Sequence, residues 1–224
     1  MITALHGMLG LPQDWSPFFQ QAHCPNLFNA TPLPYVQWAK KLNQEINPKE
    51  DNLLVGYSLG GRLGVHALLD NPSLWKGALL ISTGLKARPD KWATDQEWSQ
   101  KFSSLSWETL LEQWNAQPVF QNSSTPMRQE GDFNRQHLSA AFLEWSASKQ
   151  SDLQMVIEQL PIPIYWVVGE KDPFALHQIF LTHPDSKVII VPGAGHRVLW
   201  DNPTYFKHVI QEFYHACNFT MANH

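Results

Sequence analysis

A serine stands between glycines in the stretch "LLVGYSLGGRLG", residues 53 to 64. Residues 56 to 60 fit the pattern G-x-S-x-G, in which a sharp turn from a strand to a helix lifts a serine hydroxyl to the edge of a sheet. A serine hydroxyl is a weak nucleophile or base at neutral pH until a neighbouring group can take its proton. Ser58 is therefore a candidate catalytic residue if the chain also supplies a histidine and an orienting acid.

Two later segments supply these partners. "PIYWVVGEKDP" places Asp172 in the turn after an apolar run, and "VIIVPGAGHRV" places His196 in a glycine-rich loop after another. The chain order Ser58, Asp172, His196 is that of α/β-hydrolases, and other serine-enzyme folds use different orders. We predict that these three residues form a catalytic triad, with Glu170 as the first alternative for the acid.

A triad also needs hydrogen-bond donors for a developing oxyanion. One expected donor is the backbone N–H of Leu59, directly after the candidate nucleophile. The other is expected from the loop after the first apolar run, "LHGMLG", where the backbone N–H of Met8 is the candidate. His6 opens this loop, and its N-terminal position favours a structural role in the turn over that of general base.

Short apolar runs bounded by turn residues indicate the strands that must position these groups. Their unbroken hydrophobicity predicts strands buried on both faces of a parallel sheet. The runs are Ile2–Leu5, Leu53–Val55, Ala78–Ile81, Ile164–Val168 and Lys187–Val191.

Helical patterns lie between and after these runs. They cover Val36–Ile46, Gly61–Leu69 and Thr204–His215. The last helix is expected to begin from Asn202 or Asp201 as its cap, with Pro203 at the first helical position. Strands that alternate with helices indicate an α/β fold with a mostly parallel, doubly wound sheet.

Residues from about 86 to 155 have a different pattern. The helical stretches "DQEWSQKF", "SWETLLEQW" and "HLSAAFLEWSAS" follow one another with no strand between them. This predicts a helical insertion, and in such sheets ligands bind beyond the carboxyl ends of the strands, so the insertion is a candidate lid. Five of the ten tryptophans lie here, and we expect most of them simply to pack the insertion on the body: Trp92, Trp98, Trp107, Trp114 and Trp145.

Length and composition limit the classes of function. The 224 residues suit one domain, residues 1–224, and the formal net charge of −4 gives no basic footprint for nucleic acid. Cys24 and Cys217 form neither a disulfide framework nor a metal-binding pair, so we expect a reducing compartment and no metal site. We find no signal peptide and no apolar run near the ~18 residues of a membrane span, and therefore expect a soluble, cytoplasmic protein without a membrane partner. The oligomeric state is not indicated.

Four motifs together, "LHGMLG", "VGYSLGGR", "VVGEKD" and "GAGH", resemble the α/β-hydrolase superfamily over essentially the whole chain. Two details are similar to the family of 2-succinyl-6-hydroxy-2,4-cyclohexadiene-1-carboxylate (SHCHC) synthases of menaquinone biosynthesis. The first is an arginine after the serine motif, here Arg62, with Tyr57 just before the serine. The second is a W-x-x-x-P-x-F segment in the lid, "WNAQPVF", with Trp114 and Phe120. The resemblance implies that Tyr57, Arg62, Trp114 and Phe120 bind substrate.

The position of Arg62 makes physical sense for this family. Four residues after Ser58 on a helix, it lies about one turn from the nucleophile, and a guanidinium can grip a carboxylate with two hydrogen bonds. The family's substrate carries several carboxylates. The usual D-x-P-G-H-G-x-S loop and leading hairpin of the family are absent, and "NLFNATPLPYVQW" runs straight to a helix. Further substrate-binding lid arginines have no clear match; Lys91, Arg128 and Arg135 are the candidates.

The resemblance implies a lyase that removes pyruvate from a succinylated, enolpyruvyl-bearing cyclohexene dicarboxylate, with no metal or organic cofactor. A carboxylesterase, such as a pimeloyl-carrier-protein methyl esterase, could use the same triad through an acyl-enzyme. A non-catalytic member of the fold is a third hypothesis, against which the complete triad argues. Arg62 and the "WNAQPVF" segment favour the lyase, and the unmatched lid arginines favour the esterase.

Overall fold

The computed structural model describes residues 1–173 and 181–219. Within these ranges five parallel strands form one sheet in the order β1-β2-β3-β4-β5. The strands are β1 (Ile2–Leu5), β2 (Leu53–Tyr57), β3 (Gly77–Ile81), β4 (Ile164–Gly169) and β5 (Lys187–Val191). The predicted α/β architecture with a parallel sheet is confirmed, and every predicted strand is present, three of them longer by one or two residues.

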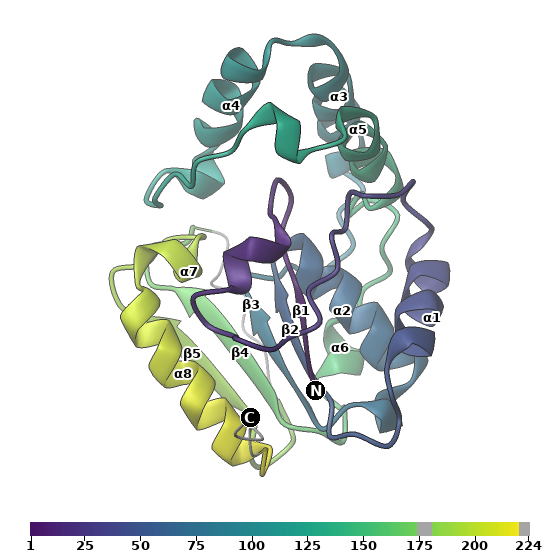
Figure 1. Ribbon diagram of the computed structural model, residues 1–224, viewed down its shortest axis with the longest axis vertical. Helices are drawn as coiled ribbons and strands as arrows, with labels where there is room; N and C mark the ends of the chain where they lie inside the picture. The colour runs from purple at the N-terminus through teal and green to yellow at the C-terminus, as the bar shows by residue number, and fades with distance from the viewer. Residues whose placement is uncertain (174–180, 220–224) are drawn as a thin grey trace.

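Helices cover both faces of the sheet, as Figure 1 shows. One face packs against α1 (Tyr35–Glu45) and α2 (Leu59–Asp70), and the other packs against α8 (Pro203–Ala216). Alternation along β2 sets this division, because Leu54 faces the α1 and α2 side whereas Leu53 and Val55 face α8. The sheet is thus buried from both sides over its central strands.

The helices begin and end close to the predicted positions. The apolar face of α8 repeats at helical spacing, with Phe206, Val209, Ile210 and Phe213 buried. Asn202 is its cap, since its side chain accepts a hydrogen bond from the Tyr205 N–H at 3.1 Å. Asp201, the other candidate cap, accepts instead from the N–H groups of Ser124 and Gly195.

One strand differs from its prediction. Val188 and Ile190 of β5 are 51% and 54% exposed, so β5 is not buried on both faces. Ile189 and Val191 pack on the side of α8, whereas Val188 and Ile190 alternate to the other face and belong to neither core cluster of the described residues. An apolar run therefore predicted the strand correctly but not its burial.

At the other edge, β1 carries a single parallel bridge from Thr3 to His23. The segment that follows, residues 24–34, has no regular structure and leads into α1 at Tyr35. This is the part of the chain that lacks the usual family loop. It passes beneath the insertion, where the Trp145 Nε1–H donates to the Leu33 carbonyl at 2.8 Å.

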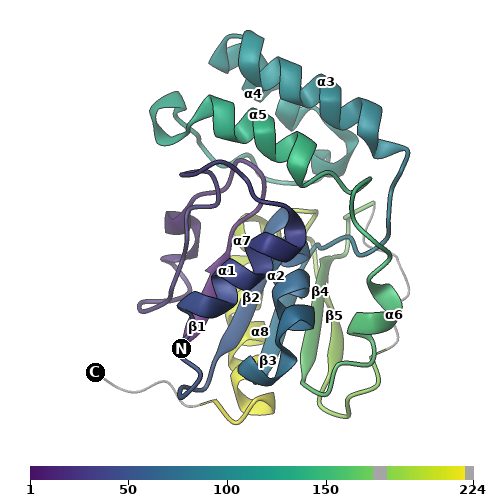
Figure 2. The same ribbon diagram turned by 90° about the vertical axis from the view of Figure 1, so that its right-hand side faces the viewer.

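The predicted helical insertion between β3 and β4 is present. Its main helices are α3 (Lys91–Ser104), α4 (Trp107–Asn115) and α5 (Arg135–Glu144), which lie beyond the carboxyl ends of the strands (Figures 1 and 2). The chain then returns to the body through α6 (Gln154–Ile157), and α7 (Val198–Asp201) precedes α8. The short 3-10 turns are η1 (Pro12–Trp15), η2 (Pro72–Leu74), η3 (Pro118–Phe120) and η4 (Glu130–Asp132).

The turn from β2 to α2 holds Ser58 in an unusual conformation. Its φ of 52° and ψ of −112° lie in a region that side chains other than glycine rarely occupy, at a cost of about 1–3 kcal/mol. The Ser58 N–H donates to the Ile81 carbonyl at 2.8 Å, and the Ser58 carbonyl accepts from the Arg62 N–H at 3.1 Å. These bonds to a neighbouring strand and to the first turn of α2 hold the strained residue in place.

The turn is possible only because Gly60 has no side chain. A Cβ on Gly60 would lie 2.3 Å from the Leu5 carbonyl oxygen, well short of the van der Waals contact distance between carbon and oxygen. The start of α2 therefore lies directly on the end of β1.

We expect Gly60→Ala to destabilise the protein by about 3 kcal/mol or more, because the clash is with backbone that cannot rotate away. Gly131→Ala is the matched control, since a Cβ there meets nothing within 4 Å. Chemical denaturation of both variants measures the difference. Equal stability of the two variants would contradict the prediction, because it would mean that the turn from β2 to α2 can accommodate a Cβ at position 60.

Candidate active site

Ser58, His196 and Asp172 come together at the carboxyl ends of β2, β5 and β4. The distance from His196 Nε2 to Ser58 Oγ is 3.2 Å, and that from His196 Nδ1 to Asp172 Oδ2 is 2.7 Å. A carboxylate can only accept, so the bond to Asp172 places the imidazole proton on Nδ1 and leaves Nε2 to take the serine proton. This is the geometry that the activation of a serine requires.

Backbone packing brings the two loops of the histidine and the acid together. A Cβ on Gly169 would lie 2.0 Å from the Gly195 carbonyl oxygen, so the end of β4 touches the histidine loop directly. Glu170, the alternative acid, points elsewhere, because its Oε2 accepts from the Gly193 N–H at 2.8 Å. Of the two acids, Asp172 is the one bonded to His196.

The loop after β1 lies against the serine. A Cβ on Gly7 would be 2.9 Å from the Tyr57 ring and 3.4 Å from Ser58 Cβ, so this loop lies immediately beside Ser58. Leu59 is the first residue of α2, so its N–H has no partner within the helix. Met8 and Leu59 both line the cavity above Ser58, as their predicted role as oxyanion donors requires.

His6 is a buried structural residue of this loop. Its Nδ1 lies 3.0 Å from the Gly7 carbonyl oxygen, to which it donates, and its Nε2 accepts from the Leu27 N–H at 3.1 Å. Burial, against a weaker opposing effect of the bond to Gly7, lowers the pKa of His6 to about 4. A neutral imidazole with both nitrogens engaged fits the structural role expected from the sequence.

A cavity of about 370 Å³ opens above the serine, between the sheet and the insertion. The predicted triad, the two predicted oxyanion donors and the four substrate-binding residues that the family resemblance implied all line it: Met8, Tyr57, Ser58, Leu59, Arg62, Trp114, Phe120, Asp172 and His196. The cavity wall also carries six cationic side chains, Arg62, Lys86, Arg88, Lys91, Arg128 and Arg197, against two carboxylates, Asp95 and Asp172. This excess of positive charge favours an anionic ligand.

Arg62 is the cation nearest the serine along the chain. Its Nη1 donates to the Tyr35 hydroxyl at 2.8 Å, and that hydroxyl donates in turn to the Trp145 carbonyl at 2.7 Å. In the described part of the chain no carboxylate lies within ion-pair distance of Arg62. Its charge contributes, after burial, to the lowering of the His66 pKa to about 4. Arg62 is thus oriented by a neutral group and keeps its charge for a ligand.

The other three candidate cations differ in their surroundings. Arg128 donates to the Leu9 carbonyl at 2.6 Å and pairs with Asp14 at 2.8 Å, both side chains 9% exposed. Arg135 does not line the cavity and donates to the carbonyls of Phe102 and Leu105 and to Glu130. Lys91 lines the cavity, and the structure gives it no ion pair in the described residues.

Aromatic side chains of the insertion form the wall over the histidine. The Phe120 and His196 rings lie edge to face at 5.7 Å, and Trp114 lies 5.5 Å from Phe120. Trp114 also packs edge to face on Trp98 at 5.1 Å, within a buried cluster that includes Phe102 and Phe142. Trp114 therefore both packs the insertion, as expected for most of its tryptophans, and lines the cavity.

Sequence reasoning missed two residues of this site. Tyr35, which orients Arg62, comes from the segment that departs from the family pattern, and no motif marks it. Arg197 follows His196 directly and contacts the insertion, a position that the glycine-rich motif could have brought to attention. In the described residues we find no group of three or more His, Cys, Asp or Glu side chains placed to hold a metal ion. No described helix combines the length and the apolar character needed to cross a membrane.

Comparison with known proteins agrees with this geometry. The family model described as "Alpha/beta hydrolase family" matches residues 5–207. The chain belongs to the alpha/beta hydrolase family. Among its relatives, a Haemophilus influenzae protein named as a candidate SHCHC synthase is 30% identical over 239 residues, covering 94% of this chain and 95% of the relative. The SHCHC synthase of Salmonella heidelberg is 26% identical over 227 residues, covering 90% and 88%.

Solved structures show the same fold. MenH from S. aureus superposes with a TM-score of 0.82 at 15% identity, covering 97% of this chain and 94% of that one. The carboxylesterase CesB from Bacillus subtilis gives a TM-score of 0.64 at 18% identity, covering 95% and 82%. This alpha/beta hydrolase is therefore SHCHC synthase-like in sequence, as its motifs indicated.

The low pKa of His6 predicts a pH dependence of stability. The folded pKa of about 4 lies below the ordinary value of 6.5, so the unfolded chain binds a proton at this site more readily. We expect the free energy of unfolding to fall as the pH drops from 6.5 toward 4, with His6 contributing up to about 3 kcal/mol.

The variant His6→Gln keeps an acceptor for the Leu27 N–H but cannot titrate. The pH dependence of its free energy of unfolding should therefore correspond to the uptake of about one proton fewer on unfolding. Denaturation at several pH values measures the slope, and NMR titration of the unchanged protein gives the His6 pKa directly. A His6 that titrates near 6.5 would contradict the prediction, even if the variant does not fold.

Proposed function

We propose that this protein is a lyase of the SHCHC synthase type. Its substrate would be a succinylated cyclohexene dicarboxylate that carries an enolpyruvyl ether, and its reaction would release pyruvate. The observation that carries the proposal is Arg62, a cavity-wall guanidinium held by the neutral Tyr35 hydroxyl one turn from Ser58. A serine-histidine-aspartate site that also offers an unneutralised guanidinium suits a substrate with carboxylates better than a plain ester.

The proposed chemistry uses each contact of the site. His196 Nε2, held by Asp172, acts with Ser58 as the base that removes a proton beside the succinyl carbonyl. The electron pair moves onto the carbonyl oxygen, where the N–H groups of Met8 and Leu59 stabilise the charge. When the pair returns to form a ring double bond, the C–O bond to the enolpyruvyl group breaks, and the departing enolate of pyruvate takes up the proton held by His196 to give pyruvate. The step needs no acyl-enzyme, metal or organic cofactor.

The cations that the sequence named as candidates for substrate binding then divide into two groups. Arg62 would bind one substrate carboxylate, and Lys91, on the wall formed by α3, is the best-placed candidate for another. Arg128 and Arg135 are committed to backbone carbonyls and to carboxylates of the protein. The aromatic wall of Tyr57, Trp114 and Phe120 would cover the ring of the substrate.

This commitment of Arg128 and Arg135 is also the observation that favours the rival function. A carboxylesterase would use Ser58 as a nucleophile toward an ester carbonyl and would then hydrolyse the acyl-enzyme. Such an enzyme has no need of lid arginines. The cytoplasmic location expected from the sequence goes with either function.

A paired assay tests the proposal. We expect the purified protein to release pyruvate from the menaquinone intermediate, to turn over short esters poorly and to show no stoichiometric burst of acylated Ser58. Ser58→Ala, His196→Ala and Asp172→Asn should each remove most of the pyruvate release. Because the three residues act as one unit, Ser58→Ala/His196→Ala should be little worse than either single variant.

The contrary result is equally specific. A clear burst with ordinary esters and no pyruvate release would establish the esterase instead. Near-normal turnover of Asp172→Asn would move the acid to another residue, with Glu170 the first to examine.

Arg62→Lys tests the carboxylate contact. An ammonium cannot reproduce the planar fork of a guanidinium, and a charge-assisted hydrogen bond contributes about 1.5–3 kcal/mol. We therefore expect kcat/KM for the carboxylated substrate to fall roughly ten- to a hundredfold. Turnover of a neutral, carboxylate-free ester, however slow, should change far less. An equal loss of kcat/KM on both substrates would mean that Arg62 only supports the turn from β2 to α2.

A further inference from the structure

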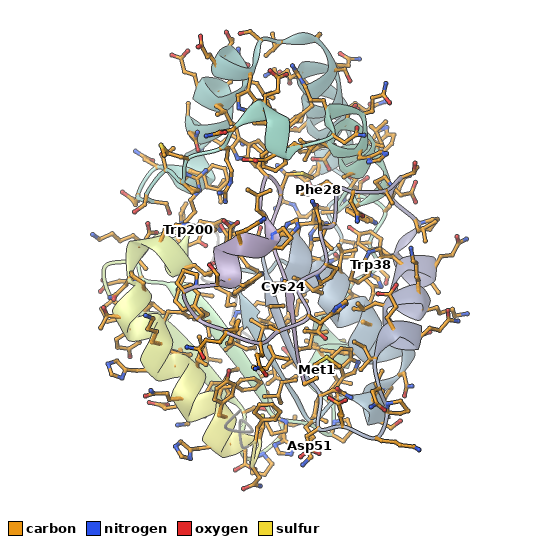
Figure 3. The ribbon with its side chains drawn as sticks, in the orientation of Figure 1. Met1, Cys24, Phe28, Trp38, Asp51 and Trp200 are labelled. Carbon is orange, nitrogen blue, oxygen red and sulfur yellow. The ribbon has the colours of Figure 1, made fainter. Side chains whose placement is uncertain are left out.

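Arg197 joins the histidine loop to the insertion. It follows His196 directly and lies at the start of α7, yet its side chain reaches into the segment after α4. Figure 1 shows this segment, residues 115–124, descending from α4 toward α7. Figure 3 labels Trp200 at the same junction.

Three hydrogen bonds and a ring contact make the junction. The Arg197 Nη1 donates to the Ser124 carbonyl at 2.8 Å, and Nη2 donates to Asn115 Oδ1 at 2.5 Å. The Arg197 N–H donates to Ser123 Oγ at 3.1 Å. The guanidinium also lies over the Phe120 ring, 3.9 Å from its centre. One side chain thus contacts both ends and the middle of a ten-residue segment of the insertion.

Neighbouring contacts hold the same two segments together. Asp201 accepts from the Gly195 N–H through one oxygen and from the Ser124 N–H through the other, at 2.9 and 2.6 Å. A Cβ on Gly195 would lie 2.4 Å from Ser123 Oγ, so backbone and segment are already in contact. The Asn122 amide donates to the Lys171 carbonyl at 3.3 Å, next to Asp172. The segment is therefore fixed to the loops of both the histidine and the acid.

The chemistry of these contacts requires an arginine. Arg197 is 4% exposed, and in the described part of the chain no carboxylate lies within ion-pair distance of it. Burial is the main cause that lowers the pKa of its guanidinium. Burying a cation without a paired anion costs free energy. The planar guanidinium offsets this cost because it donates hydrogen bonds in two directions and stacks on a ring at the same time, which an ammonium group cannot do.

We propose that Arg197 is a positioning residue that locks segment 115–124 of the insertion onto the histidine loop and so holds His196 in reach of Ser58. The proposal rests on the proposed function only for the role of His196 and Ser58. Phe120, which packs edge to face on His196, also lies against the guanidinium. Loss of this support would let the segment and the imidazole shift together.

Two measurements test the proposal on purified full-length protein. The first is hydrogen–deuterium exchange over residues 115–124 and 192–197. The second is the rate at which a fluorophosphonate labels Ser58, recorded against pH. Arg197→Lys should speed exchange in both segments and slow labelling by about 10- to 100-fold, because small displacements of a base carry penalties of that size. Asn115→Leu should act in the same direction, and the double variant should be less than additive.

Arg135→Lys is the matched control. Arg135 also makes several bonds and lies near a ring, that of Trp107, but its partners are all within the insertion. We expect it to speed exchange around residues 102–107 and to leave the labelling rate close to that of the unchanged protein. A general loosening of the fold would instead affect both arginine variants alike.

The outcomes separate this proposal from the proposed function. If Arg197→Lys shows the same exchange and labelling rates as the unchanged protein, Arg197 does not hold the two segments together and the proposal is wrong. Equal effects of Arg197→Lys and Arg135→Lys on labelling would overturn the positioning role. If the unchanged protein is not labelled at Ser58, the proposed triad fails, and exchange in segment 115–124 of Arg197→Lys still decides whether the lock exists.

Discussion

The left-handed conformation of Ser58 constrains every element around it. A serine at φ 52° is strained, and the structure holds it with bonds to β3 and to the first turn of α2. The turn also needs the backbone of Gly60 against the end of β1 and that of Gly56 against Gly61. The ends of β1, β2 and β3 and the start of α2 must therefore meet at one point. The same contacts aim the hydroxyl at the cavity and bring the loop of Met8 beside it.

Around this point the protein uses its arginines in two different ways. Arg128 and Arg197 have structural roles. Arg128 links the insertion to the loop after β1, and Arg197 links the insertion to the histidine loop. Arg62 is oriented by a neutral tyrosine and remains available to a ligand. Arg197 bonds to Asn115 and Ser124, and Arg128 bonds to the Leu9 carbonyl, so residues 115–128 are linked both to the histidine loop and to the loop after β1.

The fold by itself does not identify the ligand of this cavity. Solved structures of esterases and a lactonase share the fold at 14–18% identity, so a common fold does not fix the reaction. The charges that line the cavity of this chain give more specific information. In this chain the free cations at the cavity wall include Arg62 and Lys91, and both point the proposal toward a carboxylated substrate.

The sequence by itself determined the strands, the chain order of the predicted triad and the run of helices between β3 and β4, because these depend on local patterns. Apolar runs mark the strands, and each residue of the predicted triad lies in the turn or loop that follows one. Only the tertiary structure decided three other features. They are the exposure of β5, the choice of Asn202 over Asp201 as cap, and the hydrogen bonds and ion pairs that occupy Arg128 and Arg135. They depend on which segment lies opposite each side chain, often more than 70 residues away in the chain, as for Arg197 and Ser124. Local spacing placed Arg62 one turn from Ser58, but only the tertiary structure showed that its guanidinium donates to the neutral Tyr35 hydroxyl.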